Sequence, residues 1–180
     1  LIDGDMRKPT LALKLSISNY PGLSEYLTGF MGLDELMQEY NFDSDYRIKI
    51  LTAGSIPPNP IELIDSAKVS HMIDQLRKQF DYIILDTPPV CDVSDALAVS
   101  KFSDGVLLVT RYNYCTRTAL RDAVQQFEFV DAKLLGFVFN CYGDDNSSKY
   151  SYRKYADSSY YQHPHKQNTS DRRKVDRQKH

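Results

Sequence analysis

Residues 1–9 read LIDGDMRKP, and residues 82–89 read YIILDTPP. In each stretch an apolar run typical of a buried strand ends at an aspartate, Asp3 in the first and Asp86 in the second. Carboxylates at the carboxyl ends of parallel strands lie where α/β sheets bind ligands. Asp5 follows two residues after Asp3. Three carboxylates at one sheet edge suggest a site for Mg²⁺ and a nucleotide, because Mg²⁺ usually binds one or two carboxylates plus phosphates.

The rest of the chain body alternates β-branched apolar runs with helical patterns, which predicts a doubly wound α/β fold with a mainly parallel sheet. The expected strands are 1–3, 48–51, 82–86, 106–110 and 135–140. Residues 67–79 are expected to form a helix, because Val69, Met72, Ile73 and Leu76 are spaced for one helical face and Ser66 can cap it. Further helices are expected at 23–27, 33–39, 61–65, 95–100 and 118–129.

Composition narrows the class of protein. Apolar residues make up 42% of the chain, as in globular proteins, and no run reaches the ~20 apolar residues that span a bilayer. Cys91, Cys115 and Cys141 are odd in number and fit no zinc spacing. We therefore expect ordinary buried or half-buried thiols in a reducing cytoplasm.

Charge and hydropathy both change near the C-terminus. Residues 1–148 carry 13 basic and 21 acidic residues, whereas residues 149–180 carry 9 basic and 3 acidic residues. The apolar pattern also stops after Gly143. We therefore expect a folded domain over 1–143 and a disordered basic tail over 144–180, since such a segment cannot bury enough surface to order itself. The tail could dock on an acidic surface, and its short basic run is too weak a signal for a nucleic-acid partner.

The tail contains a cluster of five tyrosines, which are Tyr150, Tyr152, Tyr155, Tyr160 and Tyr161. They do not share one helical face, and charged residues interrupt any strand pattern. Phosphoacceptors in a flexible segment explain them better than packing does. Each phosphate would add about −1.5 to −2 charge, so phosphorylation would turn the basic tail acidic.

Taken together, these features resemble the bacterial tyrosine kinases, the P-loop enzymes that govern capsule and exopolysaccharide synthesis. On this resemblance, residues 1–7 correspond to the aspartate-bearing A-prime Walker motif and residues 83–86 to the Walker B motif. The tyrosine cluster looks like the family's autophosphorylated tail. Residues 22–29 and 54–60 also look like family segments, and the likeness covers roughly residues 1–161.

The resemblance implies ATP as the phosphoryl donor and Mg²⁺ as its metal ion. Asp5 and Asp86 would hold the metal, and Asp3 would accept the proton of the attacking tyrosine. The sequence leaves the roles of Asp3 and Asp5 interchangeable. Arg7 could stabilise charge on the transferring phosphoryl group, pair with Asp3 or Asp5, or bind a neighbouring subunit.

Two residues at other strand ends are further nucleotide-binding candidates. Related P-loop ATPases place an asparagine against the adenine, as Asn140 would be here, because an amide offers a donor and an acceptor. A turn at the strand end explains Asn140 nearly as well. Arg111 could lie near the base or the phosphates.

One family motif is missing. The phosphate-binding loop Gly-x-x-x-x-Gly-Lys-Ser/Thr occurs nowhere in the 180 residues, and the chain opens within a strand. We therefore expect a fragment truncated at its N-terminus, with an incomplete P-loop domain and without ordinary ATP affinity.

For the intact protein the resemblance implies subunits that phosphorylate one another's tails within a homo-oligomeric ring. It also implies a transmembrane polysaccharide co-polymerase as activator, a cognate tyrosine phosphatase, and a cytoplasmic position at the membrane held through the activator. Two alternatives remain open. The first is a P-loop positioning or partitioning ATPase, a nucleotide-switched binding module that would not need the tyrosines. The second is an inactive fragment or phosphotyrosine scaffold.

Overall fold

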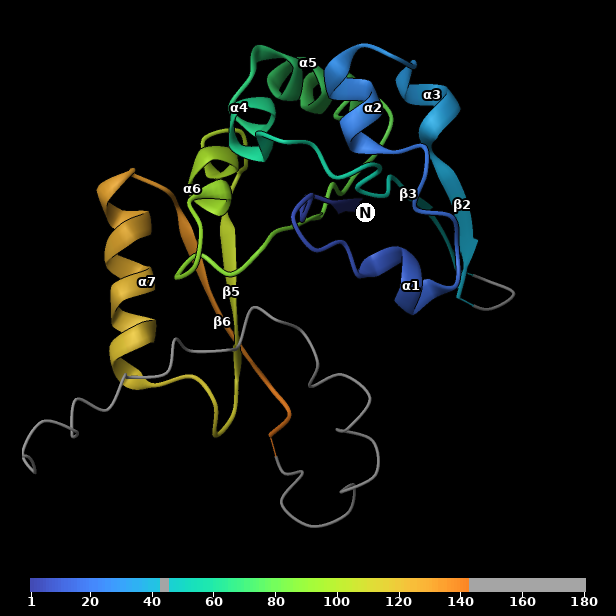
Figure 1. The fold of residues 1–180 in the computed structure, drawn as a ribbon. Helices are drawn as coiled ribbons and strands as arrows, with labels where there is room; N and C mark the ends of the chain where they lie inside the picture. The colour runs from blue at the N-terminus through green and yellow to red at the C-terminus, as the bar shows by residue number, and fades with distance from the viewer. Residues whose placement is uncertain (43–45, 143–180) are drawn as a thin grey trace, which may run out of the picture. The chain divides into compact units, whose positions relative to one another are not determined.

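The computed structural model of the protein describes residues 1–42 and 46–142 (Figure 1). The five tail tyrosines and the expected domain boundary lie outside these residues and stay predictions. The strands are β1 (Ile2–Asp3), β2 (Gln38–Asn41), β3 (Arg47–Ile50), β4 (Leu85–Asp86), β5 (Val106–Arg111) and β6 (Leu134–Asn140). The helices are α1 (Leu11–Leu15), α2 (Leu23–Thr28), α3 (Leu33–Leu36), α4 (Pro60–Ile64), α5 (Ala67–Leu76), α6 (Asp95–Ser100) and α7 (Arg117–Phe129).

β1 has a parallel neighbour on each side. It pairs with β4, where Ile2 lies opposite Leu85 and Asp3 opposite Asp86. On its other side Ile2 forms a parallel bridge with Leu51, directly after β3. Parallel strands joined by helical connections are the arrangement that the alternating sequence pattern predicted.

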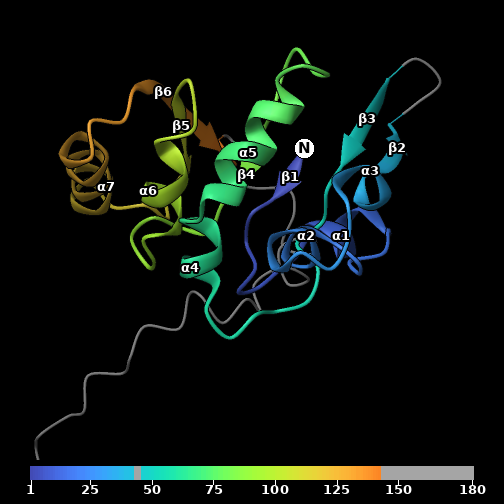
Figure 2. The ribbon, with the colours of Figure 1, turned by 90° about the horizontal axis from the view of Figure 1, so that it is seen from above.

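The apolar core lies between these strands and the helices that cover them. Ile2 of β1, Leu27 of α2 and Met72 of α5 are each at most 2% exposed and belong to one cluster. The four positions predicted for the apolar face of α5 are all buried. Seen from above, α5 lies over β4 (Figure 2). The apolar face of α5 is therefore buried as predicted, although the helix ends at Leu76 and not at residue 79.

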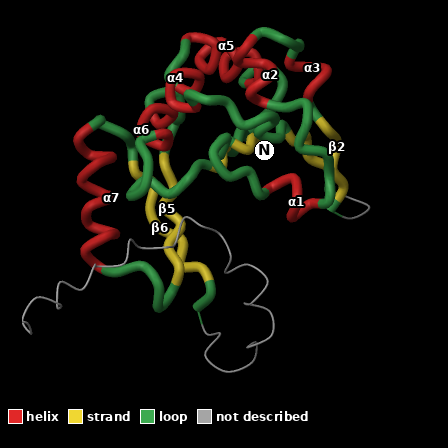
Figure 3. Tube along the Cα trace, in the orientation of Figure 1, coloured by secondary structure: helices red, strands yellow, loops and turns green. Residues whose placement is uncertain are grey.

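β5 and β6 form a second parallel pair, with α7 beside it (Figure 3). Phe127 and Ala123 are the buried residues of α7. Within the described part of the chain, much of this strand pair remains exposed, including Leu107, Val109 and Phe137. The strands are regular, but part of their apolar surface is uncovered.

The expected helix over 33–39 is wrong in its second half. α3 ends at Leu36, and Gln38–Asn41 form β2, which pairs antiparallel with β3. Glu39 lies opposite Lys49 and forms an ion pair of 3.0 Å with it. This cross-strand pairing, between two strands that follow each other directly in the chain, outweighs the weak helical pattern.

Three smaller differences from the expectations remain. The strand expected at 82–86 is limited to β4, and Tyr82 and Ile84 are exposed. α1 was not predicted. Ser66 occupies the N-cap position of α5 as predicted, but its hydroxyl donates to the carbonyl oxygen of Leu63 and makes no capping hydrogen bond.

The three cysteines are free thiols, but the expectation that they are buried or half-buried is wrong for Cys91 and Cys115, which are exposed, and holds for Cys141. In the described ranges, every helix is too short or too polar to cross a bilayer.

Candidate active site

Asp3 and Asp86 lie side by side at the carboxyl ends of β1 and β4. The backbone ladder continues one step further, because the Gly4 N–H donates to the Asp86 carbonyl oxygen at 2.7 Å. A Cβ atom at Gly4 would lie 2.8 Å from the same oxygen. Gly4 thus permits the close approach that brings the predicted carboxylates of the two motifs together.

The loop after β1 holds its carboxylates with its own backbone. The Asp5 N–H donates to Asp3 Oδ1 at 3.1 Å. Asp5 Oδ1 in turn accepts from the N–H groups of Arg7 at 3.1 Å and Lys8 at 2.9 Å. Such aspartate turns explain locally why the DGD sequence forms a tight loop at the strand end.

Asp3 is the most perturbed acid of the site. Its residue is 1% exposed, and its Oδ2 atom has no hydrogen-bond partner among the described residues. Burial raises the pKa of Asp3 to about 6, and the charges of Asp86 and Asp5 add to this rise. Backbone N–H groups of Asp5 and Leu11 act in the opposite direction. The result is a carboxyl group that changes charge close to physiological pH.

Asp86 is more accessible than Asp3. Its residue is exposed at the end of β4, yet the protein around its carboxyl group still raises its pKa by desolvation. Lys14 lowers that pKa and Asp5 raises it. The three carboxylates therefore sense one another's charge, as expected of groups that gather around a cation.

These carboxylates fit a metal site that a nucleotide completes. Among residues 1–42 and 46–142, no group of three or more His, Cys, Asp or Glu side chains is arranged to hold a metal ion. Mg²⁺ usually takes only one or two carboxylates and fills its other positions with phosphate and water. The donor set of Asp5 and Asp86, with the unpartnered oxygen of Asp3 next to it, meets that requirement.

Arg7 makes an ion pair that the sequence did not predict. Its Nε donates to Asp95 Oδ2 at 2.9 Å, and its Nη2 donates to Asp95 Oδ1 at 3.0 Å. Asp95 is 0% exposed. The sequence placed Asp95 in a short helix and left it out of the site. Its position at the start of α6, nine residues after Asp86, was the signal available.

Arg111 and Asn140 lie on the second strand pair. They are opposite each other at the carboxyl ends of β5 and β6. Asn140 Oδ1 accepts from the Cys141 N–H at 2.9 Å, which is the turn interaction, and the Arg111 guanidinium lies over the Tyr114 ring at 5.5 Å. The structure thus brings these two residues together, but on a different strand pair from the three carboxylates.

The segments 22–29 and 54–60 also meet in space. The Gly22 N–H donates to Glu25 Oε2 at 2.7 Å, and the Ser55 N–H donates to Glu25 Oε1 at 3.3 Å. Burial alone would raise the pKa of Glu25, but these and other hydrogen bonds leave it lowered. A Cβ atom at Gly54 would lie 2.2 Å from Glu25 Oε2. These contacts give the two segments a structural role in packing that does not depend on catalysis.

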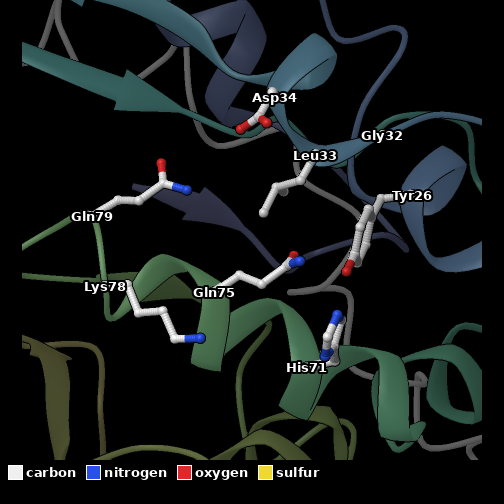
Figure 4. Close-up of a pocket in the computed structure, with 8 residues that line it drawn as sticks. All are labelled: Tyr26, Gly32, Leu33, Asp34, His71, Gln75, Lys78 and Gln79. Atoms are coloured by element: carbon white, nitrogen blue, oxygen red, sulfur yellow. The ribbon is translucent and has the colours of Figure 1, made fainter.

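An open cavity of about 570 Å³ lies elsewhere, between α2, α3 and α5. Figure 4 shows that its walls carry polar groups of mixed charge, including Asp34, His71 and Lys78. None of the predicted site residues lines it. The candidate site at the strand ends is therefore separate from this cavity.

Parallel strands that end in gathered carboxylates are typical of α/β proteins that bind ligands at the carboxyl edge of the sheet. No family model matches the chain. The chain is 33% identical to the VpsO kinase domain, with a TM-score of 0.71 over 77% of this chain and 68% of that one. The kinase domain of Escherichia coli tyrosine kinase ETK is 31% identical, with a TM-score of 0.75 over 84% of this chain and 58% of that one.

A curated relative points the same way. Tyrosine-protein kinase CpsD of Streptococcus pneumoniae serotype 4 is 36% identical over 141 residues, which are 78% of this chain and 61% of CpsD. The chain therefore belongs to the bacterial tyrosine-protein kinase family, as the sequence predicted. It spans about 60% of the length of the CpsD proteins that it matches.

Proposed function

We propose that this chain is the carboxylate-bearing part of an autophosphorylating tyrosine kinase, which transfers the γ-phosphoryl group of ATP to tyrosine hydroxyls. The observation that best supports this is Asp3, which lies beside Asp86 with a buried Oδ2 atom that lacks a partner in the described part of the chain. An unsatisfied buried oxygen costs about 1–3 kcal/mol, and such costs are concentrated at functional sites. A role of Asp3 Oδ2 as the hydrogen-bond acceptor for a substrate hydroxyl explains this cost.

Each carboxylate then has a distinct role. Asp3 would accept the tyrosine proton, since a general base works best when its pKa is near the operating pH and that of Asp3 is raised to about 6. Asp5 and Asp86 would hold Mg²⁺, which when bound neutralises charge on the phosphates. The tight turn of Asp5 and its backbone donors keep its carboxylate at the strand end.

The phosphate-binding loop would come from a segment outside the 180 residues. Among the described strands, β4 pairs with β1 and β5 pairs with β6. Each of β4 and β5 thus offers a second edge to a further parallel strand. The longer length of the relatives leaves room for such a segment. We propose that it docks beside Asp86, where its loop and the carboxylates would share the phosphates.

The remaining roles follow from the family resemblance and the charge of the chain. The five tail tyrosines would be phosphorylated by a neighbouring subunit of a ring, and a phosphatase would reverse this. The basic tail would dock on the acidic body until phosphate reverses its charge. A transmembrane polysaccharide co-polymerase would activate the kinase at the cytoplasmic face, in capsule or exopolysaccharide synthesis.

A complementation assay tests the proposal. The chain would be incubated with Mg²⁺ and ATP, with and without a separately expressed segment of CpsD that carries the phosphate loop, and phosphate would be mapped by mass spectrometry. We expect phosphate on the tail tyrosines only in the complemented mixture. Asp3→Asn and Asp5→Asn should each abolish it, whereas Asp74→Asn, an exposed acid of α5, should not. The rate should rise with pH through about 6, as Asp3 loses its proton.

Three outcomes would count against the proposal. ATP hydrolysis with unmodified tyrosines would assign the chain to the switch-ATPase class. Full activity of Asp3→Asn with loss in Asp5→Asn would remove Asp3 from the mechanism, as neither general base nor metal ligand. A complemented mixture that neither hydrolyses ATP nor modifies tyrosine would leave a scaffold role for the tail.

A further inference from the structure

The Arg7–Asp95 pair is the most buried ion pair in the described part of the chain. Two parallel hydrogen bonds of 2.9 and 3.0 Å join the guanidinium to both carboxylate oxygens. The Asp95 side chain is 0% exposed and that of Arg7 is 31% exposed. Fork-shaped pairs of this kind fix orientation as well as distance. A buried carboxylate is also costly unless it is paired, so the position of Asp95 requires its partner.

The pair joins the two loops that carry the site. Arg7 lies in the loop after β1, and its own N–H donates to Asp5 Oδ1. Asp95 begins α6, at the end of the loop that leaves Asp86. The backbone bonds between β1 and β4 end at Gly4, so beyond that point the side-chain pair holds the loops together.

The electrostatics explain why Arg7 needs such a restraint. Asp3 and Asp5 precede Arg7 closely in the same loop, and Asp86 lies opposite Asp3. An unrestrained cation would pair with these carboxylates and compete with a metal ion. Asp95 occupies Nε and Nη2 and so directs one edge of the guanidinium away from the cluster. Lysine could not replace Arg7, because an ammonium group lacks the fork that meets both oxygens of Asp95.

We propose that Asp95 is a positioning residue of the active site: it holds Arg7 in place, and through the Arg7 backbone it holds the carboxylate of Asp5. The orientation of Arg7 toward a phosphoryl group rests on the proposed function. The restraint on the Asp5 loop does not, and it can be measured without phosphoryl transfer.

The test compares Asp95→Asn with Asp104→Asn in the full chain. Asp104 also forms an arginine pair, with Arg77 at 3.0 Å, but its side chain is 88% exposed. Amide hydrogen exchange would be followed at Arg7 and Lys8, which donate to Asp5. We expect about tenfold faster exchange at these two amides in Asp95→Asn and unchanged exchange in α5 and in Asp104→Asn.

Binding of Mn²⁺, measured by water-proton relaxation, gives a second measurement that does not depend on catalysis. We expect Asp95→Asn to weaken it about 10-fold, as loss of outer-shell partners typically does. The double variant Arg7→Met/Asp95→Leu replaces the buried pair by apolar side chains, which is often neutral for stability. It should unfold at the wild-type temperature and still bind Mn²⁺ weakly.

Two results would overturn the proposal. One is a folded Asp95→Asn variant with wild-type exchange at Arg7 and Lys8. The other is a double variant that restores both stability and Mn²⁺ affinity, because Asp95 would then act on stability alone. Failure of the kinase assay with both loop measurements as expected would reject the proposed function and leave the positioning role intact.

Discussion

The two parallel strand pairs differ in what holds them. β1 and β4 have only two residues each, yet β1 is fully buried and bonded on both sides. β5 and β6 pair over a much longer stretch, but Leu107, Val109 and Phe137 remain exposed. Ladder length therefore does not decide how firmly a strand is held. The short pair is fixed by side chains, including the Arg7–Asp95 pair, and it carries the candidate site.

The largest expected effect tests whether the long pair has a core of its own. Phe127 of α7 is 2% exposed, whereas Phe129, two residues later, is 92% exposed. Phe127→Ala should lower the free energy of unfolding by about 3–5 kcal/mol, because removing a buried phenyl ring leaves a cavity. Phe129→Ala should change it by no more than about 0.5 kcal/mol. Denaturant unfolding measures both, and equal effects would show that the inner face of α7 is not buried as the structure has it.

The next effect distinguishes function from stability in the short pair. The pKa of Asp3 is raised to about 6 in the folded chain from the ordinary value of 3.8. The folded state thus holds this proton more tightly than the unfolded state, so stability falls as pH rises from about 4 to 6 and is then constant. The cost at pH 7 is about 2–3 kcal/mol.

Asp3→Asn should therefore stabilise the chain at pH 7 by a similar amount and remove this pH dependence. Unfolding in urea at pH 4.5 and pH 7 checks both expectations, with Asp104→Asn as the exposed control. A variant that is less stable than wild type at pH 7 would contradict the burial of a strained charge. Stabilisation combined with loss of activity is the usual sign of a catalytic acid or base.

How much of the fold and of the candidate site could be predicted depends on how far apart in sequence the interacting residues lie. The carboxylates of Asp3 and Asp86 were predicted to meet because each ends an apolar run, and strand ends of parallel sheets lie at one edge. Asp95 was missed because its partner Arg7 is 88 residues away, and its position at the start of α6 does not reveal that partner. β2 was missed for a different reason: its pairing with β3 is local, but the short polar stretch Gln38–Asn41 lacks the alternating apolar pattern that marks a strand.

The expected strand at 82–86 shows the opposite error. Its apolar residues indicated burial on both faces, but Ile84 is exposed and only Leu85 and Asp86 form a strand. An apolar sequence pattern shows that a side chain is suited to burial, but it does not show whether another part of the protein covers that side chain. The exposed apolar residues of β5 and β6 likewise fit a buried strand by sequence but are not covered.

The third prediction concerns the close approach of Gly4 to the backbone oxygen of Asp86. Gly4→Ala puts a Cβ atom 2.8 Å from the backbone oxygen of Asp86, which cannot move without shifting β4. We expect a loss of about 1–3 kcal/mol in the free energy of unfolding. Gly32→Ala is the matched control, because its new Cβ atom meets only the flexible end of Glu35 at 3.3 Å. Equal stability of the two variants would mean that the β1–β4 contact is looser than the structure shows.

The smallest effect on stability concerns the exposed surface of the long pair. Val109 of β5 is 65% exposed, so Val109→Lys should change the free energy of unfolding by no more than about 0.5 kcal/mol. It should nevertheless slow aggregation, because exposed apolar strands promote association between chains. Gln125→Lys adds the same charge to an exposed position of α7 and controls for net charge. Light scattering at several protein concentrations would separate the two variants. If both slow aggregation equally, charge and not the uncovered strand face governs it; if only Val109→Lys does, the exposed apolar face of β5 is the surface through which the chains associate.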